Sequence, residues 1–408
     1  MKIVLLTQYF PPEIGAPQTR LAAMVSALIE AGDTVEVVTA MPNYPLGRIF
    51  PEFRGRLLSS RTENGVLVRR VWMFAAMGSG WKRVLSYFSF TAFCCPVFIR
   101  VRRPDVLVVE SPPLSLAVPA ILFGKIRRVP VVVNVADMWP DAAVAVGALK
   151  AGRFLRLMLR LEAWAYRQAM VVSTVTDGVR GKLIAEKGVP QSKIAMLANG
   201  VDTDLFDPSS GDSEILRHLD LPEAPFVVYA GTMGLVHGLD QLIDAFATMV
   251  GSNNPYLLMI GSGSERARLA ERCEREGLTN VLFRDPIPLT ELAKLLPLAV
   301  AGVVTSAEIP INEFSRPAKL FPLMSAGLPV LFAGGGEGAQ VVRTAEAGIV
   351  VRNDPEDIAH ALGQLVEDPS RAHQMGLNGR QAVVESWSWG RQVQRWRAAV
   401  ATIVNERN

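Results

Sequence analysis

The chain of 408 residues contains little cysteine and little histidine. Three cysteines, of which Cys94 and Cys95 are adjacent, cannot form a disulfide framework in a chain of this length, so they indicate a reducing compartment. No C-x-x-C pair occurs and the four histidines are scattered, so we expect no structural zinc site. The sequence also lacks G-x-G-x-x-G and G-x-x-x-x-G-K-[ST], which argues against a nicotinamide dehydrogenase and a P-loop protein.

Long hydrophobic runs are missing as well. The longest uncharged stretch, Val84–Ile99, has sixteen residues, whereas a membrane-spanning helix needs about 20. The apolar run Ile3–Leu6 is too short for a signal peptide. Because Trp81, Lys82 and Arg83 flank the long stretch, it fits a segment lying in a membrane interface, and it fits a buried helix equally well.

A second basic segment is Arg153–Gln168. At 100° per residue, four arginines fall on one side of a helix, close to Trp164, and these are Arg153, Arg156, Arg160 and Arg167. This stripe suits anionic lipid head groups, and it also suits an ordinary solvated helix face.

The charge of the chain is unevenly distributed. Residues 1–190 hold 24 Lys and Arg against 13 Asp and Glu, whereas the remainder holds 18 against 26. The basic half calls for an anionic partner, such as nucleic acid, an acidic membrane surface or a phosphorylated ligand. Nucleic acid is disfavoured, because the aromatic residues lie in apolar runs and do not alternate with the basic ones.

Short apolar runs rich in β-branched residues alternate with helical patterns along the whole chain, which predicts parallel sheets covered on both faces. The series restarts at Phe226 after a polar, turn-rich stretch, Asp202–Asp212. We therefore predict an α/β protein of two doubly wound, Rossmann-like domains that face a cleft, over residues 1–200 and 201–385. The expected strands are Lys2–Thr7, Thr34–Thr39, Asp105–Val109, Pro130–Ala136, Met170–Thr174, Phe226–Ala230, Tyr256–Ile260, Asn280–Phe283, Ala301–Thr305, Pro329–Phe332 and Ile349–Val351.

Several loops that follow strands suit a bound anion. Gly15 precedes a helix, where the backbone can approach a phosphate. The loop from Gly231 to Gly238 holds three glycines and His237, and a second glycine-rich loop spans 334–338. Arg316 and Lys319 open a helix, a position that disfavours cations unless an anion is bound. Together they predict a diphosphate ligand such as a sugar nucleotide, although tight turns and chance surface placement explain each feature separately.

At these residues the chain resembles the GT-B glycosyltransferases of family 4, in the bacterial surface-polysaccharide branch with fucosamine-transferase and colanic-acid-assembly types. The resemblance covers nearly the whole chain. The matching pieces are KIVLLTQYFPPEIGAPQTRL, VVESPPLSLAVPA, VADMWPDAAVAVG, VSTVTDGVRGKL, ANGVDTDLF, YAGTMGLVHGLDQLIDAF, LLMIGSGSER, RPAKLFPLMSAGLPVLFAGGGEGAQVV, AGIVV and NDPEDIAHAL. The ending WSWGRQVQRWRAAVATIV resembles the final helix, here 386–408, that crosses back to the first domain.

The resemblance implies transfer of a sugar from a nucleotide diphosphate, with retention at the anomeric carbon and without a metal or cofactor. The sugar is expected to be an N-acetylated amino sugar on UDP, and the acceptor a lipid-linked or other saccharide of a surface polysaccharide. The first domain would bind the acceptor and the second the donor. A cytoplasmic protein, peripheral on the inner membrane face, follows from this reading.

The resemblance also implies roles for single residues. Asp137, His237 and Lys319 are the expected catalytic residues. The expected acceptor-binding residues are Glu13, Trp139 and Asp141. The basic and aromatic patterns described above, and not the resemblance, give the expected membrane-facing residues Trp81, Lys82, Arg83, Arg153, Arg156 and Arg160. The expected donor-binding residues are Gly15, Gly231, Thr232, Gly234, Arg316, Lys319, Gly335, Gly336 and Glu337.

Three departures from the family pattern leave an alternative open. Leu235 and His237 occupy positions where the family usually has cations, and Pro322 occupies that of a glutamate that holds the ribose. The first domain has no histidine, and Asp137 lies where many members have one. The alternative is a homologue that has lost catalysis and binds a sugar nucleotide or glycan as a partner protein.

Overall fold

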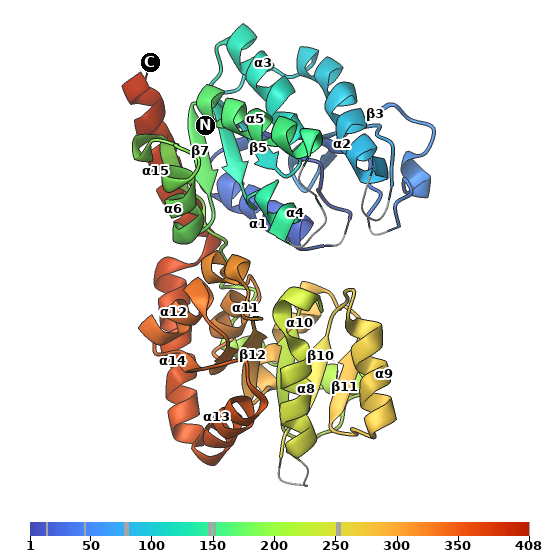
Figure 1. Cartoon of the computed structure of the whole chain (residues 1–408), viewed down its shortest axis with the longest axis vertical. Coiled ribbons are helices and arrows are strands. Elements are labelled where there is room, and N and C mark those ends of the chain that lie inside the picture. The colour runs from blue at the N-terminus through green and yellow to red at the C-terminus, as the bar shows by residue number, and fades with distance from the viewer. Residues whose placement is uncertain are drawn as a thin grey trace. The chain divides into compact units, whose positions relative to one another are not determined.

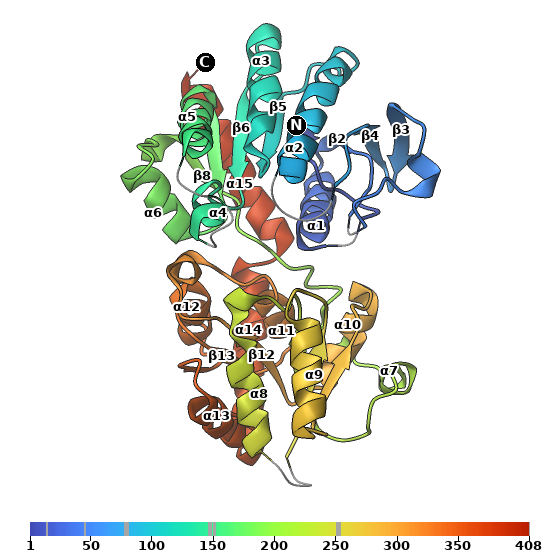
Figure 2. The ribbon, with the colours of Figure 1, turned by 45° about the vertical axis from the view of Figure 1, so that its right-hand side comes forward.

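The computed structural model describes residues 1–13, 15–44, 46–76, 81–145, 149, 152–249 and 254–407. The chain divides into two compact units (Figure 1, Figure 2), one of Met1–Asn199 with Trp389–Asn408 and one of Gly200–Ser388. Each unit is a twisted sheet with helices on both faces, so the predicted pair of doubly wound α/β domains is confirmed.

The sheet of the first unit has the strand order β3-β4-β2-β1-β5-β6-β7-β8. All neighbours are parallel except β3 and β4. Buried side chains form one hydrophobic cluster on each face of this sheet. The strands are β1 Lys2–Leu6, β2 Thr34–Ala40, β3 Leu58–Glu63, β4 Val66–Val71, β5 Val106–Ser111, β6 Val131–Val135, β7 Val171–Thr174 and β8 Ile194–Met196. The helices are α1 Ala16–Glu30, α2 Trp81–Cys94, α3 Ala117–Arg127, α4 Asp141–Ala145, α5 Arg153–Gln168, α6 Asp177–Ala185 and α15 Trp389–Arg407, with short 3-10 helices η1 Pro51–Phe53, η2 Cys95–Ile99, η3 Leu114–Leu116 and η4 Gln191–Lys193.

The antiparallel hairpin of β3 and β4 corrects the prediction of a purely parallel sheet. Its turn is Asn64-Gly65, and both residues have positive φ, 48° and 80°, as a two-residue hairpin turn requires. The sequence prediction contained neither strand of this hairpin, and it also missed β8. β3 is polar and lies at the sheet edge, so it lacks the apolar run by which the predicted strands were recognised.

Helix α2 is shorter than the uncharged stretch that predicted it. The α-helix ends at Cys94, and η2 follows with Pro96 in its first turn, where proline's missing N–H removes a helical hydrogen bond. One side of α2 is buried at Phe90 and Cys94, whereas Trp81 and Phe88 are exposed. The reading as a buried helix therefore holds for one side of α2, and contact with a membrane interface stays a prediction.

Helix α15 completes the first unit although it lies at the far end of the sequence. Trp389, Val393, Trp396 and Val400 recur every three or four residues and are buried in the same cluster as Leu21 of α1. The indole Nε1 of Trp396 donates to the hydroxyl of Ser173 at 2.7 Å.

The sheet of the second unit has the order β11-β10-β9-β12-β13-β14, and every pair is parallel. The carboxyl ends of all six strands therefore lie at one edge, where their loops gather. The strands are β9 Phe226–Ala230, β10 Tyr256–Ile260, β11 Val281–Arg284, β12 Ala301–Thr305, β13 Val330–Ala333 and β14 Gly348–Val351. The helices are α7 Glu214–His218, α8 Leu239–Thr248, α9 Arg266–Glu276, α10 Leu289–Leu295, α11 Leu320–Ser325, α12 Gly336–Thr344, α13 Pro355–Glu367 and α14 Pro369–Ser386, with 3-10 helices η5 Pro208–Ser210, η6 Leu235–His237, η7 Leu296–Leu298 and η8 Pro310–Phe314.

Candidate functional site

The loop after β9 is fixed to the loop after β10 through the backbone. Met233 N donates to Ser262 O at 2.8 Å, and Gly231 N donates to Ile260 O at 2.9 Å. Gly263 has a φ of 153°, and a Cβ there would lie 2.1 Å from Met233 O. Gly261, with a φ of 145°, meets Gly231 O in the same way, so both glycines are required for this approach. The sequence interpretation quoted these two glycines within a motif but assigned them no role.

Lys319 lies across the base of this loop. Its Nζ donates to the hydroxyl of Tyr229 and lies 3.8 Å from the centroid of that ring. A Cβ at Gly231 would lie 2.8 Å from Lys319 Cε, so the lysine occupies the space that the glycine leaves. Lys319 precedes α11, which begins at Leu320 and not at Pro317 as the sequence suggested.

The protonated form of Lys319 is less stable than that of an ordinary lysine. Within the described ranges no carboxylate pairs with its ammonium group, and burial lowers its pKa to about 7. A cation without an anionic partner in a partly buried position is stabilised by any anion that reaches it. Tyr229 was missed as a functional candidate because a tyrosine inside an apolar strand is read as core.

His237 lies beside the same tyrosine. The two ring centroids are 6.5 Å apart, edge to face, and burial together with the charge of Lys319 lowers the pKa of His237 to about 4. The imidazole is therefore neutral at pH 7 and able to donate one hydrogen bond. Two asparagines hold this loop, because Asn312 Nδ2 donates to Val236 O at 2.8 Å and Asn353 Nδ2 donates to Gly238 O at 3.0 Å.

The remaining predicted residues of the β9 loop are more open. Thr232 is exposed, and its carbonyl accepts from the hydroxyl of Tyr229 at 2.6 Å. At Gly234 a Cβ would have no neighbour within 4 Å, so the position itself does not require glycine on grounds of space.

Arg316 and Glu337 are bonded to each other. Arg316 Nε lies 3.0 Å from Glu337 Oε2, and the guanidinium lies over the ring of Trp387, 4.8 Å from its centroid. The charge of Arg316 is therefore compensated within the unit, in contrast to that of Lys319. Gly335 has open space around it, whereas a Cβ at Gly336 would lie 2.4 Å from Asn312 O. Gly336 thus brings the start of α12 against the loop that holds Arg316.

In the first unit, Glu13 and Gly15 belong to the loop between β1 and α1. The buried carboxylate of Glu13 accepts from Asn43 N at 2.6 Å, Tyr44 N at 2.8 Å and Gln18 Nε2 at 3.2 Å. It therefore fastens two loops together, which gives it a structural task besides the acceptor contact that the sequence suggested. Gly15 precedes the first residue of α1, where a Cβ would lie 2.6 Å from Gln18 Oε1.

Asp137, Trp139 and Asp141 follow β6. Asp137 is exposed, and its carbonyl accepts from Trp139 N at 2.9 Å. Asp141 lies 2.6 Å from the ammonium group of Lys187, which also pairs at 2.9 Å with the buried Glu162. Asp141 is thus engaged within the unit. The side chain of Asp137 keeps exposed surface, but surrounding residues bury its carboxyl enough to raise its pKa.

A polar network that the sequence did not reveal lies close to Asp137. Arg20 of α1 pairs with Glu110 at the end of β5, and Glu110 accepts from Asn134 Nδ2 at 2.8 Å. The charges of Arg20 and Glu110 both act on Asp137. These residues lay inside strand and helix patterns. The parallel pairing of β5 with β6 sets Glu110 opposite Asn134, and Arg20 reaches Glu110 from α1.

The expected membrane-facing residues are at the surface of the first unit. Trp81 is 70% exposed, and Lys82, Arg83, Arg153, Arg156 and Arg160 are exposed as well. Across the described residues, the structure contains no helix with the length and apolar character needed to span a bilayer. Nor do the described parts of the chain group three His, Cys, Asp or Glu side chains as a metal site would.

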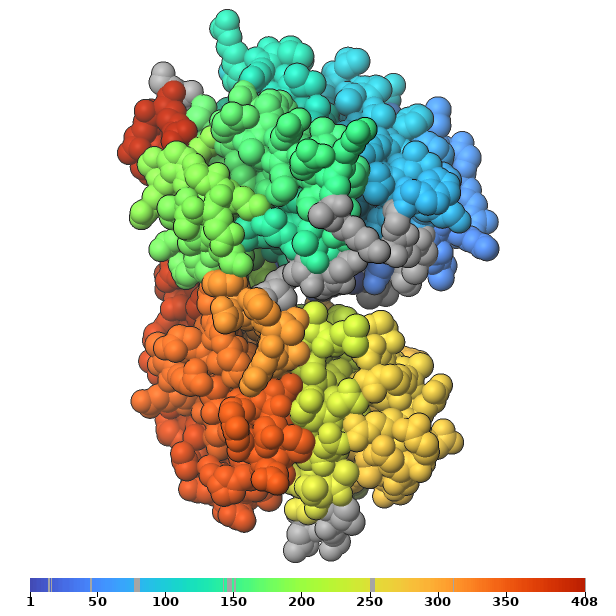
Figure 3. All heavy atoms as spheres, viewed as in Figure 1, coloured from blue at the N-terminus to red at the C-terminus, as the bar shows by residue number. Residues whose placement is uncertain are grey.

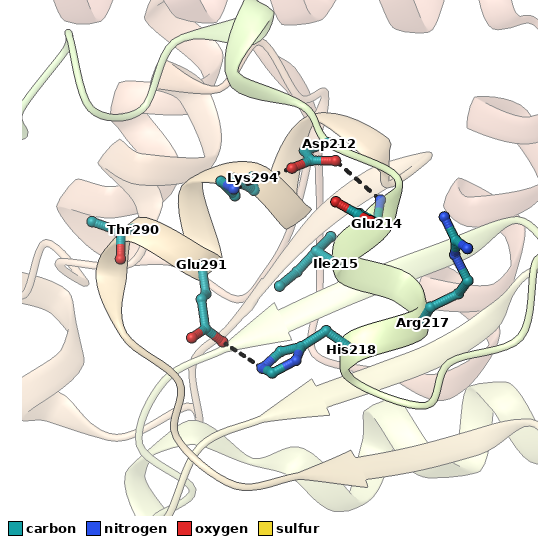
Figure 4. A pocket seen from close by; sticks show the side chains of 8 residues that line it. All are labelled: Asp212, Glu214, Ile215, Arg217, His218, Thr290, Glu291 and Lys294. Atoms are coloured by element: carbon teal, nitrogen blue, oxygen red, sulfur yellow. Dashed lines mark hydrogen bonds and ion pairs between the residues drawn. The ribbon is translucent and has the colours of Figure 1, made fainter.

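A hollow of about 760 Å³ in the second unit contains none of the predicted residues. Figure 4 shows that it lies between α7 and α10, where His218 Nε2 is 3.8 Å from Glu291 Oε2 and Lys294 Nζ is 3.1 Å from Asp212 Oδ2. These ion pairs join the walls of the hollow to each other. The presence of a hollow therefore does not identify the candidate site, whose features are the glycine loops and Lys319, which has no carboxylate partner among the described residues.

Comparison with known proteins accounts for both units. Residues 15–200 match the family described as glycosyl transferase 4-like domain, and residues 213–382 match the family described as glycosyl transferases group 1.

Three individual proteins illustrate the similarity. A protein of Escherichia coli (strain K12) named for colanic acid biosynthesis, glycosyl transferase WcaI, is 28% identical over 295 residues, which cover 69% of this chain and 71% of the relative. The GDP-mannose-dependent alpha-(1-6)-phosphatidylinositol monomannoside mannosyltransferase of Mycobacterium tuberculosis (strain CDC 1551 / Oshkosh) is 22% identical over 414 residues, 95% of each chain. Anabaena Alr3699/HepE, solved in complex with UDP and glucose, has a TM-score of 0.72 at 18% identity and shares the fold over 98% of this chain and 100% of that one.

Proposed function

Because the chain is a GT-B glycosyltransferase, made of a glycosyl transferase 4-like domain and a group 1 domain, and uses a nucleotide sugar donor, we propose its finer specificity and mechanism. The reaction is transfer of a sugar, with retention at the anomeric carbon, from a UDP-linked donor to a lipid-linked or other saccharide of a cell-surface polysaccharide. An N-acetylated amino sugar is the proposed group, and fucosamine-type transfer is included in this proposal. The proposed reaction uses no metal and no cofactor, and the nucleotide sugar is counted as a substrate.

The observation that carries this proposal is the ammonium group of Lys319, which lacks a carboxylate partner in the described structure and lies at a loop that needs glycine. The diphosphate of the donor supplies the missing negative charge there. His237, neutral at pH 7, donates a hydrogen bond to the same group. The donor lies close to the backbone at five positions, which are Gly231, Thr232, Gly234, Gly335 and Gly336.

The chemical task of these residues is to stabilise the negative charge that grows on the leaving diphosphate. In a front-face displacement the bond between the anomeric carbon and the diphosphate oxygen breaks, and that oxygen helps to take the proton of the attacking hydroxyl. A donor group placed where charge develops contributes about 2.7–4 kcal/mol to lowering the barrier. Lys319 and His237 have this role. Arg316 and Glu337, which form an ion pair with each other, also contact the donor.

The acceptor is proposed to bind the first unit, where Asp137 orients the reacting hydroxyl and Gly15, Glu13, Trp139 and Asp141 surround it. The surplus of basic residues in this part of the chain, 24 against 13 acidic, favours an anionic lipid-linked acceptor. The relatives named for colanic acid biosynthesis and for a phosphatidylinositol mannoside act in surface-glycan and glycolipid synthesis, which agrees with this choice. A cytoplasmic protein, peripheral at the inner membrane face, follows.

Calorimetry with UDP, GDP and their sugars tests the donor proposal. We expect UDP and a UDP-linked N-acetylated amino sugar to bind, and slow hydrolysis of that donor to occur without acceptor. Preferred binding of GDP would contradict the choice of base. Binding without any hydrolysis or transfer would favour a binding protein without catalysis, the alternative suggested by Leu235, which is 76% exposed, and by Pro322.

A further inference from the structure

The hydroxyl group of Tyr229 lies at the carboxyl end of β9 and uses both of its hydrogen-bonding capacities. Tyr229 is the fourth residue of the apolar strand Phe226–Ala230 and is 0% exposed. Its O–H donates to the carbonyl of Thr232 at 2.6 Å, and its oxygen accepts from the ammonium group of Lys319. A phenylalanine would fill the same apolar space, so burial of the ring alone does not account for the hydroxyl.

This hydroxyl connects three segments of the second unit. Tyr229 belongs to β9, Thr232 to the loop that follows this strand, and Lys319 to the segment that leads into α11. Because the single proton of the phenol is donated to Thr232, the phenol oxygen acts as an acceptor, and Lys319 is the donor of the second bond. The phenol therefore fixes where the ammonium group lies relative to the backbone of the loop.

The ring of Tyr229 also contacts this cation. Lys319 Nζ lies 3.8 Å from the ring centroid, where the face of an aromatic ring attracts a positive charge. A Cβ at Gly231 would lie 3.2 Å from the same Nζ, so the ammonium group lies close to the glycine loop. An ammonium group has three N–H donors, and Tyr229 accepts one of them. In the described part of the chain the other two have no acceptor, which leaves them available to an anion.

The titratable groups near Lys319 do not replace the phenol as its partner. His237 lies edge to face with Tyr229, and its pKa of about 4 makes it neutral at pH 7. The carboxylate of Glu337 is bonded to Arg316 at 3.0 Å. Among the described residues, the group that orients the ammonium of Lys319 is therefore the uncharged phenol.

The loop after β9 is also anchored independently of this phenol. Val236 O accepts from Ala307 N at 3.0 Å and from Asn312 Nδ2 at 2.8 Å, and Val236 and Asn312 are 76 residues apart in the chain. In Figure 3, yellow-green and orange atoms from these two parts of the chain adjoin on the visible face of the second unit. Because these contacts do not involve Tyr229, we expect that removal of its hydroxyl leaves the fold intact.

We propose that Tyr229 is a positioning residue, which holds the ammonium group of Lys319 at the glycine loop for the diphosphate of the nucleotide sugar. The inference rests on the proposed function of Lys319 and adds the residue through which that lysine is oriented. The hydroxyl of Tyr229 is committed to Thr232 and Lys319, so it acts on the diphosphate through the lysine. Loss of the hydroxyl should therefore weaken anion binding while Lys319 is present, and should have no effect once Lys319 is absent.

A double-mutant cycle with inorganic diphosphate as the probe tests this role by calorimetry. Tyr229→Phe removes the hydroxyl and keeps the ring, and it should weaken diphosphate binding about tenfold. In a protein that already carries Lys319→Met, the same substitution should change the affinity by less than about twofold, because the residue that it positions is gone. The measurement is made at about pH 6, below the pKa of about 7 of Lys319, so that the lysine is protonated in the unchanged protein.

Tyr256→Phe is the matched control. Tyr256 is also buried, and its hydroxyl also donates to a backbone carbonyl, that of Pro222 at 3.3 Å, but it is the first residue of β10, at the opposite edge of the sheet. This variant should bind diphosphate like the unchanged protein. Denaturant unfolding checks the fold of every variant. Should Tyr229→Phe not fold, 3-fluorotyrosine at position 229, whose oxygen is a weaker acceptor, takes its place and should weaken binding about twofold.

The cycle distinguishes positioning of Lys319 from a purely structural role of the hydroxyl. An equal loss of affinity with and without Lys319 would assign the effect to the bond with Thr232 and overturn the inference. Unchanged affinity in the Tyr229 variant, or no diphosphate binding by the unchanged protein, would overturn it as well. UDP binding on the same samples reports separately on the proposed function. If diphosphate binds with the expected coupling and UDP binds no more tightly than diphosphate, the nucleotide proposal fails and the role of Tyr229 stands.

Discussion

At the scale of single residues, Lys319 and Arg316 show that packing decides whether a cation is available to a ligand. The cation lies against the face of Tyr229 and in the space left by Gly231, and no carboxylate pairs with it among the residues described. Arg316, three positions earlier, is buried against Trp387 and paired with Glu337. Two cations that look equivalent in the sequence thus differ in their availability to a ligand.

Replacing Lys319 by alanine should lower turnover more than hundredfold while the fold stays intact. The reason is the loss of a cation where negative charge develops on the diphosphate, a change of about 2.7–4 kcal/mol in the barrier. Steady-state transfer or donor hydrolysis, with circular dichroism as the check on folding, measures it. Turnover near that of the unchanged protein would remove Lys319 from the site.

The lowered pKa of Lys319 predicts a pH dependence of donor binding. Because its pKa is about 7 in the free protein, the fraction of protonated lysine falls as pH rises above 7. UDP affinity should therefore fall about tenfold between pH 7 and pH 8.5, since each pH unit above the pKa reduces the competent fraction up to tenfold. Lys319→Arg keeps its charge and should show a much flatter profile by calorimetry.

The effect of pH on stability has the opposite direction to its effect on UDP binding. Between the lowered pKa of about 7 and the ordinary value near 10.4, the unfolded chain binds more protons at this position than the folded one. This group therefore makes the free energy of unfolding rise with pH across that window. Thermal unfolding without ligand should show this rise in the unchanged protein relative to Lys319→Met, and a matching profile in both would contradict the lowered pKa.

At the scale of elements, the loops after β9 and β10 act as one piece because two glycines let their backbones meet. A Cβ at Gly263 would lie 2.1 Å from Met233 O, at a φ of 153°. Gly263→Ala should weaken UDP binding at least tenfold and destabilise the second unit by roughly 1–3 kcal/mol. Gly363→Ala in α13, where a Cβ meets nothing within 4 Å, should leave binding unchanged. Calorimetry and denaturant unfolding distinguish the two, and equal behaviour would refute the coupling of the loops.

The sequence predicted the buried parallel strands most reliably. β9, β10 and β12 have the predicted boundaries, because buried parallel strands are continuous apolar runs. Three strands were missed. β3 is a polar edge strand without such a run, the run of β4 is interrupted by Arg69 and Arg70, and β8 has only three residues. Helix α2 was taken as longer because Pro96 was not read as its end.

The candidate site was only partly accessible from the sequence. Glycine loops and cations carry local signals, so Gly231 and Lys319 were found. Tyr229, Asn312 and the pair of Arg20 and Glu110 act through contacts between distant segments, which no local pattern shows. The engagement of Glu13 and Asp141 in internal bonds was hidden for the same reason.

At the scale of the whole molecule, the surface charge of the first unit predicts binding to anionic vesicles. Replacing Arg153, Arg156 and Arg160 by glutamine should weaken flotation with phosphatidylglycerol vesicles by at least tenfold, since each cation near such a surface contributes about 1 kcal/mol. The matched control replaces three exposed arginines of the second unit, Arg217, Arg275 and Arg343. An equal loss in both triple variants would speak against the proposed membrane-facing surface.

Helix α15 belongs to the first unit, so we expect that a substitution in it destabilises that unit without affecting the other. Trp396 is 1% exposed and bonded to Ser173, so Trp396→Ala should lower the free energy of unfolding of the first unit by about 3–5 kcal/mol. UDP affinity should stay within twofold, because the donor loops belong to the other unit. Thr402→Ala, on the exposed side of α15, serves as the control. A parallel loss of UDP binding in Trp396→Ala would contradict this separation.

The return of α15 to the first unit also sets an order of events during synthesis. Residues 200–388 are translated before Trp396 and its neighbours. All residues of the second unit are therefore synthesised before α15, which covers one face of the sheet of the first unit. A chain that ends at Ser388 and is released from the ribosome would contain the whole second unit but would expose the apolar side chains of α1 that α15 covers.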